Sequence, residues 1–321
     1  MVEFLFNLCL SDNIRGKYWY QAPETRWEVI DMDKPDLERV IGHAYWMATN
    51  PPYYSSERLL EYLELGGDPN AARDQLSCLP HWVGLHGTNE DLYALITAGG
   101  EVDCRSAWGH TPLFWIYYEC ALQNVIPHDR VEALLERGAN INATEQDGDT
   151  PLHKLTTSLY PRPDEVAFLV RHGAKVGPRN KKGRQPIHNA AEMCQPLTAA
   201  KLVELGAEIN AQDSDGLTPL HIIGKGISVW HWPEARLSAA VTGLLDLGAS
   251  PNIKNKSGQT VLTHYLGRFG DMGSIFKTLL EHGADPTLAD KDELTPSQHA
   301  LSHGHREVAE MFAVQWQALN A

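Results

Sequence analysis

The sequence predicts an all-α fold with short β-hairpin-like turns, arranged as an α-solenoid of about eight stacked units. Two observations predict it: a Thr-Pro-Leu-His sequence or a close variant recurs along the chain, and a Gly-Ala signature falls between successive copies. The copies start near residues 78, 111, 150, 185, 218, 260 and 295, so that two spacings are 33 residues and the others are 33 plus an insertion. Such a period is typical of stacked repeats rather than of independent domains.

Each unit is predicted to contain two helices and a tight turn. Pro151 lies at the first turn of a helix, where its missing N–H costs nothing, and Thr150 before it can accept a backbone N–H of that turn. A second helix has apolar residues at helical spacing from Val131 onward and ends at Gly138, because glycine adopts the left-handed conformation of a helix stop. The polar residues around Gly148 then have the composition of a hairpin.

These signatures resemble the ankyrin repeat over about residues 45–321, and the copies at 206–210 (Gly-Ala-Glu-Ile-Asn) and 218–221 (Thr-Pro-Leu-His) show the resemblance well. The resemblance implies a protein-binding module that uses a concave face made of hairpin tips and first helices. We expect an ankyrin repeat domain over 45–321, with units starting near 45, 78, 111, 150, 185, 218, 260 and 295. Residues 1–44 are predicted to be an N-terminal capping segment.

Composition argues against several classes of function. The chain has 27 Lys and Arg against 41 Asp and Glu, a formal net charge of −14, which disfavours broad binding to nucleic-acid phosphates. No apolar run approaches the roughly 18 to 20 residues of a membrane span, and no basic residue precedes the apolar N-terminus as in a secretory signal. The five cysteines form no Cys-x-x-Cys pair. We therefore expect a cytoplasmic protein with reduced cysteines, monomeric when free.

The histidines invite a metal hypothesis, which the pattern disfavours. Three occupy the fourth position of a helix opening, where the resemblance implies hydrogen bonds that tie neighbouring hairpins: His153, His188 and His221. His81 falls in the same register. The segment from His299 to His305 has closer ligand spacing, but no carboxylate or thiol clearly completes a set. Motifs of nucleophilic, metalloprotease or phosphate-binding sites are missing from the sequence, and we expect no catalytic activity, cofactor or metal.

The register also predicts a partner-binding surface at hairpin tips and on outward positions of first helices. Trp108 is a large aromatic residue where a small polar one would do, and Trp and Arg often anchor interfaces. Arg179, Lys181, Lys182 and Arg184 form a basic tip on an acidic chain, although solvation alone also accounts for such a tip. The predicted partner-binding residues are Trp108, His110, Asp147, Asp149, Lys181, Lys182, Arg184, Asp215, Leu85, Tyr118, Glu192 and Met193.

The sequence leaves three functions open. The first is a binding module for a protein partner, including an inhibitor or immunity-type protein, and the second is a secreted or host-directed effector on the same scaffold. The third is an enzyme whose site is built from residues 1–44 and the insertions, six residues in the unit from Thr111 and nine in the unit from Thr218. The second insertion contains Trp230 and Trp232, which either pack on the helices or mark a second contact site.

Overall fold

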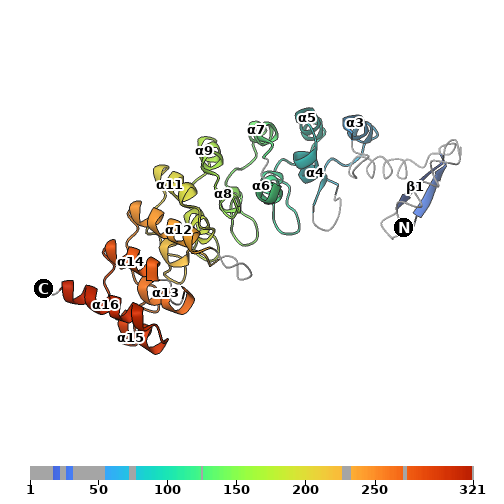
Figure 1. The fold of residues 1–321 in the computed structure, drawn as a ribbon. Helices are drawn as coiled ribbons and strands as arrows, with labels where there is room; N and C mark the ends of the chain where they lie inside the picture. Colours follow the sequence, from blue (N-terminus) through green and yellow to red (C-terminus); the bar gives the residue numbers. More distant parts are fainter. Residues whose placement is uncertain are drawn as a thin grey trace. The chain divides into compact units, whose positions relative to one another are not determined.

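The structure is a computed structural model that describes residues 17–21, 27–31, 55–71, 77–123, 126–225, 233–269 and 273–319. Its described part from residue 55 onward consists of short helices joined by turns, as the sequence predicts (Figure 1). Two compact units divide the chain, one comprising residues 1–107 and 128–138 and the other residues 108–127 and 139–321.

In the described residues of the first compact unit there are two paired strands and four helices. Strands β1 (Lys17–Gln21) and β2 (Trp27–Asp31) pair antiparallel. These two strands come before the helical stack in the sequence, and their Tyr, Trp, Val and Ile residues favour strands. The rest of residues 1–44 lies outside the described part. The helices are α3 (Ser56–Glu64), α4 (Leu79–His86), α5 (Asn89–Thr97) and α7 (His128–Glu136).

The second compact unit contains the remaining helices, which pack in two rows. One row is α6, α8, α10, η1, α13 and α15, and the other is α9, α11, α12, α14 and α16, with each helix in contact with the next. Their bounds are α6 Pro112–Gln123, α8 Pro151–Leu155, α9 Pro163–Arg171, α10 Pro186–Glu192, α11 Pro196–Glu204, η1 Pro219–Ile222, α12 Glu234–Asp246, α13 Val261–Phe269, α14 Gly273–Glu281, α15 Pro296–Ser302 and α16 Arg306–Leu319. The insertion with Trp230 and Trp232 lies outside the described residues.

The core repeats with the sequence period. In the five units that open at residues 111, 150, 185, 218 and 260, a large aliphatic residue two positions after the opening Thr or Gln is completely buried. Burying one such side chain contributes about 1.5 to 3 kcal/mol, so that the stack gains a similar amount at each of these five units. These residues are Leu113, Leu152, Ile187, Leu220 and Leu262.

Buried histidines join each helix opening to the next hairpin. His153 Nδ1 accepts the backbone N–H of Thr150 at 3.2 Å, and its Nε2 lies 3.0 Å from the carbonyl oxygen of Arg184 in the following hairpin. Because Nδ1 is the acceptor, the proton of the neutral ring resides on Nε2 and is donated to that carbonyl. His188 and His221 repeat the arrangement, with Nε2 3.3 Å from the carbonyl oxygens of Leu217 and Gln259 respectively. The predicted structural role of these three histidines is confirmed.

Asparagines of the Gly-Ala signature make a second link between consecutive units. The side chain of Asn142 donates to the carbonyl of Gly173 at 2.9 Å and accepts the backbone N–H of Lys175 at 2.9 Å. Asn210 makes the same pair of bonds to Gly248 and Ser250. One side chain thus satisfies two backbone groups of the next unit that would otherwise need water.

The hairpins themselves form a third link, and it explains where glycine is needed. The backbone N–H of Ser214 donates to the carbonyl of Lys182 in the preceding hairpin at 2.9 Å. Gly183 beside it has φ +70°, and a Cβ there would lie 2.7 Å from the Ser214 nitrogen. Glu293 holds the corresponding positive φ of 60° in the hairpin between α14 and α15, the last hairpin in the described part of the chain. A residue with a Cβ is tolerated at this position because no later hairpin in the described part of the chain packs against it.

Burial makes the histidine links sensitive to acid. Burial lowers the pKa of His188 and of His221 from 6.5 to about 4, and it also lowers the pKa of His153. The unfolded chain takes up these protons near pH 6.5, whereas the folded chain takes them up only near pH 4. The contribution of the neutral histidines to the free energy of unfolding is therefore fully present above pH 6.5. It is lost as the pH falls from 6.5 toward 4.

We expect the free energy of unfolding to fall by about 2 kcal/mol for each of His188 and His221 between pH 7.5 and pH 5.0. Changing both His188→Gln and His221→Gln should reduce this loss, because glutamine does not titrate and Gln298 already occupies the same register in the last unit. Urea unfolding at the two pH values measures it. The exposed His303→Gln serves as the control, and an equal acid loss in the double variant would contradict the assignment.

Candidate functional site

A groove of about 280 Å³ lies beside α6 and the hairpin that precedes α8. It combines aromatic side chains with carboxylates. Five of the predicted partner-binding residues come together in it: Trp108, His110, Tyr118, Asp147 and Asp149. The other lining residues are Phe114, Glu145, Gln146 and Lys154.

Stacked rings form one side of the groove. Trp108 stacks on Trp115 with ring centres 6.3 Å apart and planes 12° apart, and His110 stacks on Phe114 at 4.6 Å. Tyr118 lies with its ring centre 5.0 Å from that of His110. Trp108 is 41% exposed and Tyr118 36%, whereas His110 is buried. His110, predicted as a contact residue, therefore supports the aromatic side from beneath.

Carboxylates form the other side of the groove. Glu145 Oε1 accepts the backbone N–H groups of Asp147 at 2.8 Å and Asp149 at 3.0 Å, which holds the hairpin in shape. Asn180 donates to Asp149 Oδ1 at 2.7 Å. The side chain of Asp147 is exposed at the tip. Two of the three carboxylates are thus engaged in holding the loop, and Asp147 presents its charge to solvent.

Lys154 lies within the groove and partly neutralises it. Its Nζ is 4.4 Å from the centre of the Tyr118 ring, within the range of a cation–π contact. Burial lowers the pKa of Lys154, while the charges of Asp149, Glu145 and Glu119 oppose that shift. Three carboxylates against one ammonium leave an excess of two negative charges next to exposed aromatic faces. This chemistry favours a cationic ligand.

Arg184 of the predicted basic tip forms ion pairs within the protein instead of facing solvent. Arg184 forms ion pairs with Glu192 at 2.9 Å and with Asp213 at 3.4 Å, and its side chain is only 12% exposed. Arg184 and Glu192, both predicted to contact a partner, therefore neutralise each other inside the protein. Register alone could not show this, because the pair spans eight residues and depends on the hairpin folding back over α10. Lys181 and Lys182 remain exposed.

The remaining predicted partner-binding residues, Met193, Leu85 and Asp215, differ in how exposed they are. Met193, expected to face outward, is buried at the end of α10, and its carbonyl accepts a hydrogen bond from Arg236; that expectation was wrong. Helix α10 ends there, and the chain turns inward at Cys194, which has φ 52°. Leu85 is half-buried in the first compact unit, and Asp215 is exposed at its hairpin tip.

The Arg184 ion pairs generate a stability prediction. Arg184→Met should lower the free energy of unfolding by about 2 to 4 kcal/mol, because it leaves the nearly buried Asp213 carboxylate without its cation. Lys182→Met, two residues away and exposed, should change it by less than about 0.5 kcal/mol. Urea unfolding at pH 7.5 compares the two variants, and equal effects would show that Arg184 has no special structural role.

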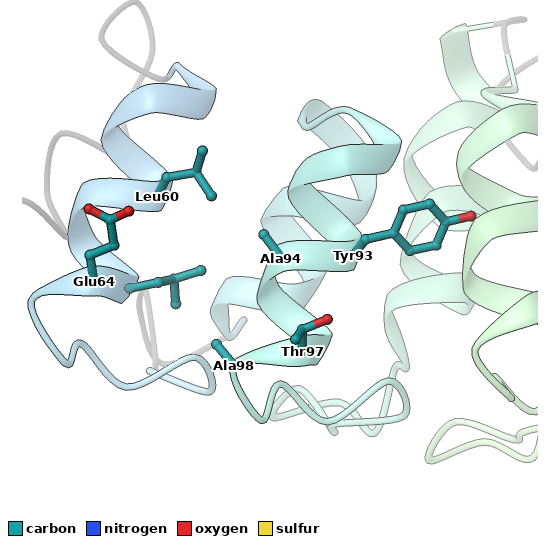
Figure 2. A pocket seen from close by; sticks show the side chains of 7 residues that line it. Leu60, Glu64, Tyr93, Ala94, Thr97 and Ala98 are labelled. Atoms are coloured by element: carbon teal, nitrogen blue, oxygen red, sulfur yellow. The ribbon is translucent and has the colours of Figure 1, made fainter.

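A larger groove, about 410 Å³, lies in the first compact unit between α3 and α5. Figure 2 shows Leu60 and Glu64 of α3 facing Ala94, Thr97 and Ala98 of α5 across a shallow gap. Its lining is mostly apolar, with no convergent set of titratable groups among the described residues. Size alone does not make it the better functional candidate.

The first compact unit also contains a cysteine pair that sequence reasoning missed. Cys78 and Cys104 are joined as a disulfide, with Cα atoms 7.4 Å apart, whereas we expected reduced cysteines. His81 Nδ1 lies 2.9 Å from Cys78 Sγ and 3.6 Å from Cys104 Sγ. Within the part of the chain that the structure describes, these three residues are the group with metal-ligand proximity. The signal was available, since both cysteines break the repeat pattern.

The histidines near the C-terminal helices have other contacts. His299 Nε2 lies 2.7 Å from Asp290 Oδ2, so that the ring bonds to the hairpin that precedes its own helix. The rings of His303 and His305 stack with centres 6.3 Å apart. No described helix is both long and apolar enough to cross a membrane.

Residues 118–213 match the family model for ankyrin repeats in three copies. The solved ankyrin repeat domain of Bcl-3, a member of the IkappaB protein family, resembles 72% of this chain with a TM-score of 0.58 and 25% identity, and 97% of that domain is covered. The chain has the fold of an ankyrin repeat domain, and residues 118–213 match the repeat family in sequence. Ankyrin repeat proteins are generally protein-interaction modules and typically non-catalytic.

Curated relatives share the repeats. The human ankyrin repeat and SOCS box protein 6 is 31% identical over 193 residues, which cover 54% of this chain and 42% of that protein. The human SH3 and multiple ankyrin repeat domains protein 2 is 28% identical over 57% of this chain and 11% of its own length. Ankyrin repeat protein nuc-2 of Neurospora crassa is 25% identical over 73% and 20% respectively. The chain thus spans less than half the length of these ankyrin relatives.

Proposed function

We propose that this ankyrin-repeat protein binds a basic segment of a protein partner in the groove between the rings of Trp108 and Tyr118 and the carboxylate of Asp147. The observation that carries the proposal is the juxtaposition of exposed aromatic faces with an excess of negative charge. The protein acts as a non-catalytic module, monomeric when free and located in the cytoplasm.

The physical chemistry of the groove supports an arginine or lysine as the anchoring residue of the partner. A cation over an aromatic face gains about 0.5 to 2 kcal/mol, and a neighbouring carboxylate adds directional hydrogen bonds. Trp108 is held by its stack on Trp115, so that binding orders little that is not already ordered. The acidic charge of the whole chain, −14, also steers a basic segment toward it.

The role built on this binding is that of an inhibitor or immunity-type protein, which occupies a basic surface of its partner. An effector that acts in a host uses the same contact chemistry. The two are distinguished by whether a captured partner loses its own activity when the purified ankyrin protein is added, or keeps it.

The test is a site-specific cross-link followed by affinity measurement. A photoreactive residue placed at Gln146, inside the groove, should capture the partner, and the cross-linked partner peptide should contain Arg or Lys. In the double variant Trp108→Ala and Asp147→Asn, the dissociation constant measured by calorimetry should rise by about 30-fold or more, since loss of one hot-spot contact costs about 2 kcal/mol or more. Raising the salt concentration should weaken binding of the unmodified protein.

The control is Leu197→Ala, which removes a large apolar side chain from α11 that is more exposed than Trp108 and lies outside the groove. It should leave the affinity unchanged. If Leu197→Ala and the groove variant bind equally well, or if the captured peptide is acidic, the groove is not the binding surface.

A further inference from the structure

Two cysteines replace conventional residues of the repeat at positions that face each other. Cys78 stands where the openings of later units have Thr150 and Thr218, and Cys104 stands five residues after the helix-stopping glycine, where Ala143 and Ala211 stand in other units. The paired replacement occurs within one unit. A single stray cysteine would not need its neighbour, whereas a bond or a shared ligand needs both.

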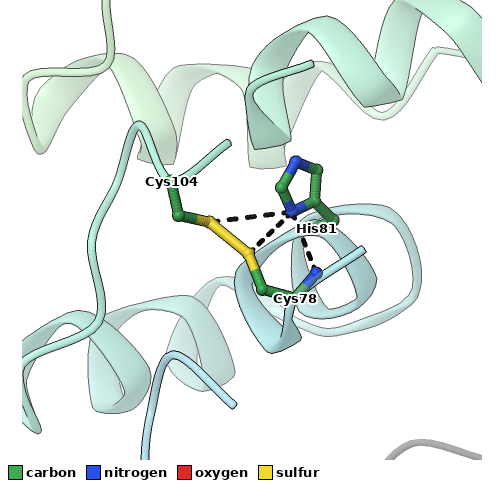
Figure 3. Close-up of side chains that lie close together, drawn as sticks. All are labelled: Cys78, His81 and Cys104. Atoms are coloured by element: carbon green, nitrogen blue, oxygen red, sulfur yellow. Dashed lines mark hydrogen bonds between the residues drawn. A yellow bond between two sulfur atoms is a disulfide. The ribbon is translucent and has the colours of Figure 1, made fainter. Parts of the chain in front are cut away.

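The three side chains meet at the N-terminus of α4, as Figure 3 shows. Their ligand atoms lie within 4.8 Å of one another. His81 is completely buried, and Cys104 and Cys78 are 7% and 9% exposed. The positive end of the helix favours anionic sulfur at Cys78, its N-cap residue.

The repeat fixes which ring nitrogen of His81 faces the sulfurs. In the sister units, Nδ1 accepts a bond at the helix opening and the Nε2 proton points toward the next hairpin. In His81, Nδ1 likewise lies 3.4 Å from the Cys78 backbone nitrogen as its acceptor. Nδ1 has one lone pair in the ring plane, so that a metal ion held between it and the two sulfur atoms replaces the bond from the Cys78 N–H.

We propose that Cys78, His81 and Cys104 bind one zinc ion when the two cysteines are reduced. Two thiolates and one imidazole are the ligands that zinc prefers, and a water molecule completes the four-coordinate shell. Two thiolate charges neutralise Zn²⁺, which suits a site this deeply buried.

Distances support a bridging ion. The Cα atoms are 7.4 Å apart, beyond the 4.4 to 6.8 Å usual for disulfides, and an ion between the sulfurs spans a wider gap. Tetrahedral zinc places nitrogen and sulfur ligands about 3.5 Å apart, close to the 3.6 Å between His81 Nδ1 and Cys104 Sγ. Zinc binding requires the 2.9 Å contact between Nδ1 and Cys78 Sγ to lengthen and the two sulfur atoms to move apart once the S–S bond is reduced.

The disulfide and the zinc site are alternative states of the same atoms. A thiol reductant transfers two electrons and two protons to the disulfide, breaking the S–S bond and leaving two thiols while the reductant becomes a disulfide. Zinc binding then releases the two thiol protons as two Zn–S bonds form. This inference is independent of the proposed partner-binding groove.

The experiment uses the full chain, reduced with a phosphine reductant and stripped of metal, then titrated with Co²⁺ and with Zn²⁺. We expect thiolate-to-cobalt charge transfer, tetrahedral cobalt absorption, and one zinc per chain by elemental analysis after gel filtration. Zinc should also slow alkylation of Cys78 and Cys104 by iodoacetamide by about 10-fold or more, measured by peptide mass mapping. Buried Cys194 in the same digest is the internal control.

The variants Cys78→Thr and Cys104→Ala install the residues that sister units carry, so that the fold is expected to persist, as circular dichroism checks. Each should lower zinc affinity by about 100-fold or more, because loss of an outer-shell partner alone costs 10- to 100-fold. Cys194→Ser should bind zinc normally. Two outcomes would overturn the proposal. In one, the reduced chain takes up no zinc although its Cys78–Cys104 disulfide forms normally on oxidation. In the other, both variants take up zinc as the unmodified chain does.

Discussion

The hydrogen bond from a neutral imidazole to the next hairpin is the constraint on which the stack depends. Each buried ring of His153, His188 and His221 satisfies a helix N-terminus with one nitrogen and a carbonyl of the following unit with the other. Because one rigid side chain serves both ends, the distance between consecutive units is set chemically. The hairpin glycines and bridging asparagines then fit a spacing that already exists.

Most of the fold could be predicted from the sequence because the constraints are local and repeated. Pro151 at a first helical turn and Gly138 at a helix end have one structural meaning each, and the period confirms it several times over. The β-hairpin of residues 17–31 could not be predicted in this way, because it occurs once and shares nothing with the repeat. The boundary between the capping segment, residues 1–44, and the repeat domain, residues 45–321, stays a prediction.

The candidate site was predictable only in part, since register gives the position of a side chain and not its partners. Trp108, Tyr118 and Asp147 could be assigned to one surface because the hairpin tips and first helices of the repeat were expected to share the concave face, and they line one groove. The ion pairs of Arg184 with Glu192 and Asp213 depend on side-chain reach, and the burial of Met193 depends on how one helix ends. Cys78 and Cys104, 26 residues apart, were overlooked because the cysteines were tested for Cys-x-x-Cys spacing and not against the residues that other units have at these positions.

The position of Lys154 over Tyr118 has a consequence for recognition. A cation tethered to α8 competes with any incoming one at an effective concentration set by a short, rigid connection, in the millimolar range or above. A free amino acid or a single weakly held lysine loses that competition. In the proposed mode of binding, a partner has to engage Trp108 and Asp147 together, so that the tethered ammonium would select extended basic segments over isolated charges.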